Sequence, residues 1–402
     1  MRLKSPIDLG RARPRLTSLA AAGALTLGMA GFAVAQAGPA SADPHQVYTT
    51  VGSDTTQDIM NQYSLDLGVN TLGSWNATDP VTNTATSPPP FITPANAAGG
   101  QCSFSRPNGS GQGLAALRKS INQSTSAAQL PGPPQANCID FSRSSSGPGS
   151  NQSATGSLVY IPFGLDAVTI AAGSATTITQ ANNFTLANLQ SLYNCNAVTV
   201  GGVAYNPGTG TTLGNIDMYI PQSGSGTLNF WAGIMGFSTS SLPVCLHQTI
   251  VAGPNTGTIV EEHDGTDVTS DPNGVTPFSV AQWVSQRNGH NDRRHSAILQ
   301  NIGGVFPCAG SSNCTAAGTA INTAFPVTRE VFNVVPFNKV TSGMTGFDPV
   351  LAQLLAGTNS NLCQDIFTIQ AYGFALLGSG TTDLCGSTAS TLRAFDPATN
   401  PV

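Results

Sequence analysis

The sequence predicts an α/β fold, because strand-like and helical segments alternate along the chain. Residues 159–170, VYIPFGLDAVTI, are apolar almost throughout, as in a strand that is buried on both faces. Residues 184–193, FTLANLQSLY, follow with helical spacing and with Thr185 as a helix start. A further strand is expected in NIDMYIPQ, residues 215–222, ahead of a helix whose apolar face carries Leu228, Trp231, Ala232 and Met235.

Other segments extend the same alternation in chain order. An extended run from residue 45 leads into a helix with Ile59, Met60 and Tyr63 on one face. A second helix is predicted to follow the Gly/Ser loop 108–111, with Leu114, Leu117 and Ile121 on its apolar face. The apolar pair Ile139 and Phe141 indicates a strand that ends near Ser142–Ser145. The stretch TPFSVAQWVSQRNG, from Thr276, favours a helix, and FPVTREVFNVV, from Phe325, favours a strand.

The first 42 residues have the features of a secretory signal peptide. A basic front is followed by an Ala/Gly/Leu-rich stretch, and Ala40-Ser41-Ala42 places cleavage before Asp43. No Cys follows this apolar run and the C-terminal residues have no apolar tail, so the expectation is a secreted, extracellular chain without a lipid anchor.

The charge of the secreted part excludes broad electrostatic partners. Removing five basic residues and one acid with the signal peptide lowers the formal net charge from −5 to −9. An acidic chain is a poor match for nucleic acid or for anionic lipid, whereas a small anion held by backbone dipoles stays compatible. About 360 residues exceed what one core usually supports, so two lobes are expected.

Eight cysteines in an exported chain predict four disulfides. The nearest-neighbour pairing is one of 105 possible connectivities. It would join Cys102 to Cys138, Cys195 to Cys245, Cys308 to Cys314 and Cys363 to Cys385. No Cys-x-x-Cys or His-x-x-x-His spacing occurs, so neither a metal site nor a cofactor is expected.

The stretch SGSGT, residues 223–227, carries the clearest functional signal. Ser225 stands where a helix N-cap belongs, and Gly224 and Gly226 leave the first-turn N–H groups accessible. Such a helix start suits an oxyanion. The alternative is a capped helix that simply follows a turn. Three more polar stretches, GSDTTQD, NGSGQG and DFSRSS, stand at similar positions, as loops converging on one cleft would require.

In their order and intervals, these stretches resemble the phosphate-binding substrate-binding proteins of ABC transporters, the PstS-like branch of the type 2 periplasmic-binding fold. SGSGT before a helix is the most specific element, and the composition resembles that of an actinobacterial secreted protein. The resemblance implies a monomer with two α/β lobes that close on a phosphate through crossover strands. Residues 43–163 and 329–402 would then form one lobe, and residues 164–328 the other.

The resemblance also implies site residues. Ser225, Gly226 and Thr227 match the Ser-Gly-Thr phosphate loop of the family. Thr55 and Thr56 fall where its first loop offers a hydroxyl and an N–H, and Ser110 falls at the start of the second helix.

Two positions depart from the family pattern. Pro221 stands where the family has an Arg four residues before the loop serine, so Arg143 or Arg106 would have to supply the guanidinium. Ser145 stands where the family has an Asp that accepts the proton of hydrogen phosphate. A site with donors only could hold sulfate, unless a carboxylate such as Asp54 takes that role, and phosphate remains the expected anion.

The function expected from this sequence is extracellular capture of phosphate or a similar oxyanion, with an ABC permease as partner and no catalysis. A secreted anion scavenger or surface-interaction module is the first alternative, and a phosphatase or esterase the second. Gly-x-Ser-x-Gly is absent. The segment VEEHDGTD around His263 and Asp264 could hold a triad member or a cation, but a solvated acidic loop is the expectation.

Overall fold

The computed structural model describes the greater part of the chain. The described residues are 47–68, 71–78, 91–94, 102–121, 136–173, 178, 183–209, 212–310, 314, 318–378 and 383–395. The predicted signal peptide, residues 1–42, lies outside them. Within these ranges no helix is both long enough and apolar enough to cross a membrane.

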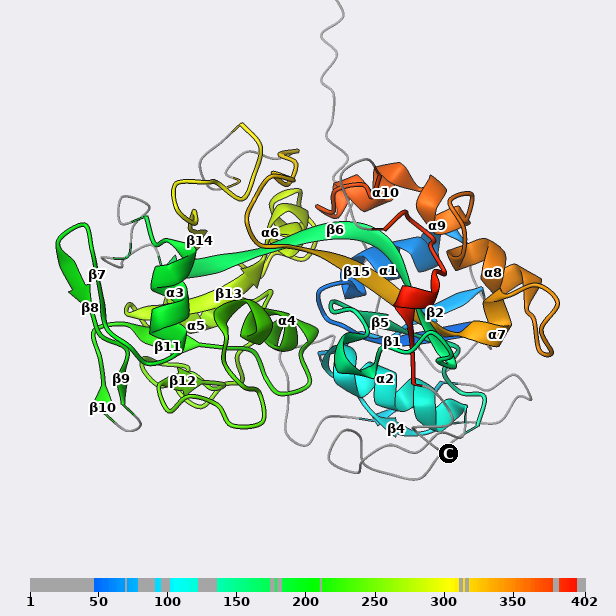
Figure 1. The fold of residues 1–402 in the computed structure, drawn as a ribbon, viewed down its shortest axis with the longest axis horizontal. Helices are drawn as coiled ribbons and strands as arrows, with labels where there is room; N and C mark the ends of the chain where they lie inside the picture. The colour runs from blue at the N-terminus through cyan, green and yellow to red at the C-terminus, as the bar shows by residue number, and fades with distance from the viewer. Residues whose placement is uncertain are drawn as a thin grey trace, which may run out of the picture. The chain divides into compact units, whose positions relative to one another are not determined.

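One mixed sheet organises the described chain (Figure 1). Its path runs β12-β11-β13-β6-β15-β5-β1-β2, and β14 and β16 pair with β6 outside this path. Its strands are β1 (Tyr48–Gly52), β2 (Leu72–Ser74), β5 (Phe141–Ser144), β6 (Leu158–Gly173), β11 (Asp217–Tyr219), β12 (Leu246–His247), β13 (Gly274–Ser279), β14 (Ala297–Leu299), β15 (Thr328–Pro336) and β16 (Arg393–Ala394). Short hairpins join β3 (Phe91–Ile92) to β4 (Phe104–Ser105), β7 (Val198–Val200) to β8 (Val203–Tyr205), and β9 (Gly208–Thr209) to β10 (Thr212–Leu213).

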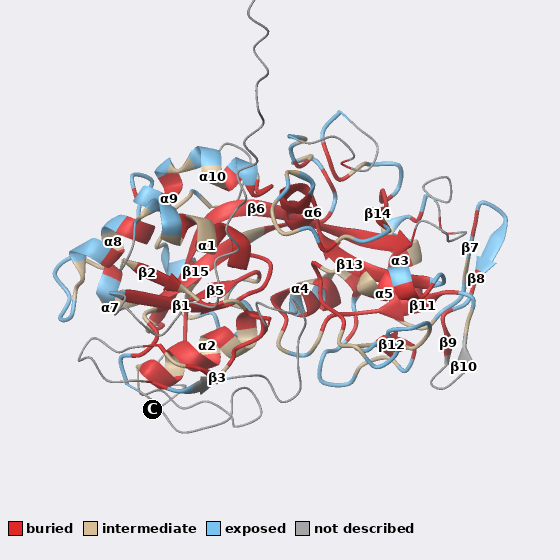
Figure 2. Cartoon of the chain, turned by 180° about the vertical axis from the view of Figure 1, so that it is seen from behind, coloured by how far each residue is buried: buried red, intermediate tan, exposed pale blue. Residues whose placement is uncertain are grey.

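The sheet has two parallel parts on either side of an antiparallel pair. Strands β2, β1 and β5 are parallel to one another, and so are β13, β11 and β12. Between them, β6 pairs antiparallel with β15 from Leu158 to Ala167 and with β13 from Val168 to Ala172. All 16 residues of β6 are buried, which explains its apolar sequence (Figure 2). The predicted α/β class and the two crossover strands near 159–170 and 325–335 are confirmed.

The expected lobe boundaries fall inside these crossover strands. Residues 163 and 164 are in β6, and residues 328 and 329 open β15. The two strands are the chain's long continuous connections between the parallel parts, so a hinge there remains the prediction.

Ten α-helices connect the strands within the described residues. In chain order they are α1 (Gln57–Asp66), α2 (Gly109–Ser120), α3 (Leu186–Tyr193), α4 (Gly226–Met235), α5 (Thr266–Ser270), α6 (Val280–Arg287), α7 (Phe337–Val340), α8 (Pro349–Leu355), α9 (Asn361–Gln364) and α10 (Ile366–Ala371). Two predicted caps are present: Thr185 accepts from Asn188 N in a capping box, and Ser225 accepts from Leu228 N. The helix expected from Thr276 was placed too early, because Gly274–Ser279 pairs with β6 as β13 and α6 begins only at Val280.

The disulfides join the pairs that the sequence predicted. Cys102 pairs with Cys138, Cys195 with Cys245, Cys308 with Cys314, and Cys363 with Cys385. Each bridge closes a loop of 50 residues or fewer in sequence separation, so each one constrains a local part of the unfolded chain.

Candidate functional site

The hydroxyls of the predicted phosphate loop converge on a carboxylate of the chain itself. Ser225 Oγ donates to Glu262 Oε2 and Thr227 Oγ1 donates to Glu262 Oε1, each at 2.9 Å. Thr55 Oγ1 donates to the same Oε1, also at 2.9 Å, from the loop between β1 and α1. All four side chains are fully buried. Three hydroxyls from two loops therefore bind one carboxyl group, that of Glu262.

Arg329 supplies a guanidinium at the same hydroxyls. Its Nη1 donates to Thr227 Oγ1 at 2.6 Å, and its Nη2 donates to Thr55 Oγ1 at 3.4 Å. The same guanidinium forms an ion pair with Asp166, with Nη2 to Oδ2 at 2.8 Å. Arg329 and Asp166 are directly opposed in the β15–β6 register, so the crossover strands themselves position this pair. Asp166 also accepts from Ser279 and from the backbone of Ala281.

Neither arginine proposed from the sequence takes this place. Arg143 donates from all three guanidinium nitrogens to the chain around β1 and β2. Its acceptors are the backbone carbonyls of Thr50, Gly52, Ser53 and Trp75 and the hydroxyl of Ser74. Arg106 Nη1 donates to Asn76 O. The guanidinium at the hydroxyls is therefore Arg329, because β15 brings it there while Arg143 is committed to holding the loop after β1.

The two Gly/Ser loops do lie together, as predicted. Gly111 N donates to Gly224 O at 3.0 Å. Ser110 Oγ accepts from Ser145 N at 3.0 Å and lies 3.3 Å from Ser145 Oγ. A Cβ added to Gly226 would lie 2.3 Å from Ser110 Oγ, which is closer than real contacts allow. The structure thus brings Ser110, Ser145 and Gly226 together beside the hydroxyls that donate to Glu262. Glycine at position 226 allows Ser110 to lie this close to the start of α4.

The remaining predicted residues occupy the loop after β1. Thr56 is fully buried as the N-cap residue of α1, without a side-chain capping bond. Asp54 is also fully buried; its Oδ1 accepts from Thr55 N, and its Oδ2 lies 3.1 Å from His263 Nδ1. Both residues are therefore part of the buried site, but Asp54 faces His263 rather than the hydroxyls of α4.

The expectation of a solvated acidic loop around His263 is wrong. Glu261 is 4% exposed, and Glu262 and His263 are fully buried. Ser279 N donates to Glu262 O at 3.1 Å, and Gln286 Nε2 donates to His263 O at 2.8 Å, so β13 and α6 hold this segment in place. Local composition predicts exposure for such a run of charges. The burial arises from contacts with residues that are distant in sequence.

Burial and neighbouring charges shift the pKa values of the acids at this site. The pKa of Glu261 and that of Glu262 are raised well above the usual range, first by burial and then by the charge of Asp54. Burial also acts to raise the pKa of Asp54, but hydrogen bonding to His263 and the charge of that ring hold it below its usual range. Asp54 is therefore the acid of the group that stays ionised most readily.

Comparisons with known proteins give a likeness of fold at low identity. No family model matches the chain, and no curated protein matches it. An ABC-type phosphate transport receptor from Vibrio cholerae is 14% identical, with 82% of this chain and 100% of that chain covered and a TM-score of 0.43. A phosphate-binding protein from Stenotrophomonas maltophilia is 15% identical, with 89% and 98% covered and a TM-score of 0.42.

A third solved structure has phosphate bound. It is a phosphate ABC transporter substrate-binding protein from Clostridium perfringens, described as putative, which is 12% identical, with 82% and 99% of the two chains covered and a TM-score of 0.39. At such identities and TM-scores the likeness assigns no ligand. The function proposed below rests on the side chains of this chain.

Proposed function

We propose that this protein is an extracellular solute-binding protein that captures phosphate, or a closely similar tetrahedral oxyanion, for uptake by an ABC transporter. The observation that carries the proposal is the convergence of Thr55, Ser225, Thr227 and Arg329 on one carboxylate. These donors come from a loop after β1, from the start of α4 and from the crossover strand β15. Such a set is typical of a preformed oxyanion site.

Phosphate would take the place of the Glu262 carboxylate among these donors. Hydroxyls and a guanidinium that bind a carboxylate also match phosphate oxygens, and the helix start adds N–H groups and a favourable dipole. Ser110, Ser145 and Gly226 would line the neighbouring wall, where they already lie in contact. Glu262 is then an internal competitor that must leave when the ligand enters.

The burial of the site supports binding by domain closure rather than at an open surface. Thr55, Ser225 and Thr227 are fully buried, and their ligand would be largely dehydrated. Arg329 also lines a neighbouring pocket of about 640 Å³ with Phe230 and Phe332, which offers an approach to the guanidinium. Opening about the crossover strands β6 and β15 would expose the hydroxyls to solvent.

Titration calorimetry with an anion panel tests this function. The purified protein and Glu262→Gln are each titrated with phosphate, arsenate, sulfate and a phosphonate. The amide keeps the shape of Glu262, but it cannot ionise and it has one acceptor oxygen for the three hydroxyls instead of two. Phosphate should therefore bind about 10-fold more tightly to the variant than to the parent, about 1.4 kcal/mol. If neither protein bound any anion of the panel, the proposed function would be overturned. Weaker phosphate binding by Glu262→Gln would instead show that Glu262 assists the ligand, and only its role as competitor would be abandoned.

A further inference from the structure

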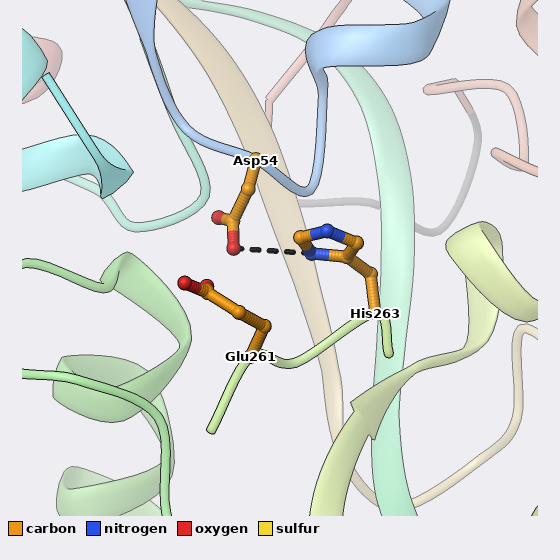
Figure 3. A group of neighbouring side chains, drawn as sticks. All are labelled: Asp54, Glu261 and His263. Atoms are coloured by element: carbon orange, nitrogen blue, oxygen red, sulfur yellow. Dashed lines mark ion pairs between the residues drawn. The ribbon is translucent and has the colours of Figure 1, made fainter. Parts of the chain in front are cut away.

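Asp54, Glu261 and His263 form a compact buried group beside the hydroxyls (Figure 3). One potential ligand atom from each residue lies within 4.8 Å of the others, and Asp54 Oδ2 is 3.1 Å from His263 Nδ1. Asp54 comes from the loop after β1, whereas Glu261 and His263 come from the segment before α5. Figure 3 shows all three side chains directed toward one another.

Each acid of this group has one oxygen held by a donor from outside the group. Thr55 N donates to Asp54 Oδ1 at 3.0 Å, and Asn108 Nδ2 donates to Glu261 Oε1 at 2.8 Å. Within the described part of the chain, Glu261 Oε2 and His263 Nε2 have no hydrogen-bond partner, and Asp54 Oδ2 and His263 Nδ1 have only each other, at 3.1 Å. Buried polar atoms are rarely left unpaired, since each such atom costs free energy. Since one atom from each residue lies within 4.8 Å of the others, a single ligand between them could pair with all three residues.

The neighbouring cations are already committed to other groups. Arg329 pairs with Asp166, and Arg293 pairs with Asp58 at 2.8 Å. Two carboxyl groups and an imidazole therefore converge in a buried site, and neither of these arginines pairs with them. A divalent metal ion would replace the protons of these groups and bind one ligand atom from each residue.

We propose that Asp54, Glu261 and His263 bind one divalent transition-metal ion, with Zn²⁺ as the best match. One imidazole nitrogen with two carboxylate oxygens suits Zn²⁺ and its first-row neighbours better than Ca²⁺ or Mg²⁺, which prefer oxygen ligands only. Thr55 N and Asn108 Nδ2 act as the outer partners that orient the two carboxylates. Three protein ligands leave coordination positions open for a ligand from outside. The site stands independently of the proposed oxyanion function.

Sequence spacing could not reveal this site. Asp54 is more than 200 residues from Glu261 and His263, and the Glu-x-His spacing of those two is not a recognised metal pattern. The sequence-based expectation of no metal rested on the absence of such patterns.

Direct metal binding tests the proposal without phosphate. Tag-free protein is stripped with EDTA, exchanged into phosphate-free buffer and titrated with Zn²⁺ by calorimetry. One Zn²⁺ per chain with a dissociation constant of about 1 μM or tighter is expected. Glu261→Gln and His263→Ala should each weaken binding at least 100-fold.

The pair His295 and Asp264 offers a matched control. It contains the same residue types at 3.4 Å and lies close in sequence, but its histidine is about half exposed and Asp264 is already bonded to Thr266. His295→Ala should leave the Zn²⁺ dissociation constant within about 2-fold. The proposal would be overturned if the parent bound Zn²⁺ with a dissociation constant of 1 mM or weaker. It would also be overturned if Glu261→Gln and His263→Ala bound Zn²⁺ as tightly as the parent.

A spectroscopic measurement on the parent protein covers the case in which these variants fail to fold. Cu²⁺ bound at this site should show hyperfine coupling to one imidazole nitrogen by electron paramagnetic resonance, and Zn²⁺ should displace it. Cu²⁺ bound without nitrogen coupling, or with several coupled nitrogens, would overturn the assignment of these ligands.

Discussion

Two buried arginines near the candidate site have different partners and therefore different roles. Arg143, at the end of β5, is fully buried and donates mainly to backbone carbonyls around β1 and β2. Arg329, at the start of β15, is 5% exposed and donates to the Asp166 carboxylate and to the hydroxyls of Thr55 and Thr227. Burial is nearly the same, so the acceptors distinguish the two side chains.

The comparison indicates how a buried guanidinium can serve structure or binding. Carbonyls of Gly52, Ser53 and Trp75 are fixed parts of the backbone, and Arg143 ties them into one rigid loop. Hydroxyls can rotate and exchange partners, so Thr55 and Thr227 are able to turn from Glu262 to an incoming anion while Asp166 holds Arg329 in place. We infer that Arg143 preorganises the loop that carries Thr55, and that Arg329 takes part in binding.

The largest effect is expected from Arg143→Met. The substitution keeps much of the side-chain volume but leaves several buried carbonyls without donors, so the free energy of unfolding should fall by roughly 4 kcal/mol or more. Urea denaturation followed by circular dichroism measures this. Arg294→Met is the control, because Arg294 pairs with a half-exposed Asp292 and should change stability by no more than about 1 kcal/mol. Equal losses in the two variants would contradict the structural role of Arg143.

The second effect separates binding from stability at Arg329. Arg329→Gln should weaken phosphate binding about 100-fold, roughly 2.7 kcal/mol, because it removes a charged donor from the oxyanion site. It also leaves Asp166 buried without its ion-pair partner, so the double variant Asp166→Asn/Arg329→Gln is needed to remove that charge. Calorimetry should show weak phosphate binding in both proteins and higher thermal stability in the double variant. Parent-like affinity in the double variant would exclude Arg329 from the site.

Local sequence patterns predicted the scaffold better than the site. The apolar run of β6, the cap at Ser225 and the cysteine order all depend on neighbouring residues, and each was predicted correctly. The burial of Glu262 depends on hydroxyls such as that of Thr55, 207 residues away, so no local pattern could show it.

Arg329 could have been found from the sequence. Asp166 is the one charged residue in the apolar run 159–170, and a lone acid in a buried strand requires a partner. The second crossover strand contains Arg329, and two crossover strands that pair in one sheet can bring such residues together. Arg143 and Arg106 were the arginines beside the polar loops in sequence, whereas Arg329 is far from those loops in sequence.

A smaller effect on stability is expected from Asp217, a buried acid close to Asp271. Tyr219 OH donates to Asp271 Oδ2 at 2.6 Å, and Asp217 is 1% exposed nearby in β11. Burial, and then the charge of Asp271, raises the pKa of Asp217 to about 7. Since this folded pKa lies above the unfolded value of 3.8, the contribution of Asp217 to stability is lost as the pH rises from about 4 through 7.

Asp217→Asn should remove this pH dependence. The variant is expected to be more stable than the parent by about 2 kcal/mol at pH 8, where Asp217 is ionised in the parent. The difference should be much smaller at pH 5, where Asp217 in the folded parent is still largely protonated. Urea denaturation at the two pH values measures the difference. A variant that is destabilised equally at both pH values would show that Asp217 is ionised and well solvated in the folded protein.

The smallest effect compares two helix N-caps, an exposed one at Thr185 and a buried one at Ser225. Thr185 Oγ1 accepts from Asn188 N in a capping box at the start of α3, on the exposed side of that helix. Ser225 Oγ accepts from Leu228 N at the start of α4 and also donates to Glu262.

Thr185→Ala and Ser225→Ala should each lower the free energy of unfolding by about 1 kcal/mol, because each removes one cap. Only Ser225→Ala should also weaken phosphate binding, by about 5- to 10-fold, or roughly 1 kcal/mol for the loss of one hydrogen bond to the ligand. Calorimetry with phosphate and urea denaturation of both variants separate the two contributions. If Ser225→Ala lost stability but bound phosphate as tightly as Thr185→Ala, the hydroxyl would serve only as a cap, and the SGSGT sequence would be a capped helix start rather than a binding loop.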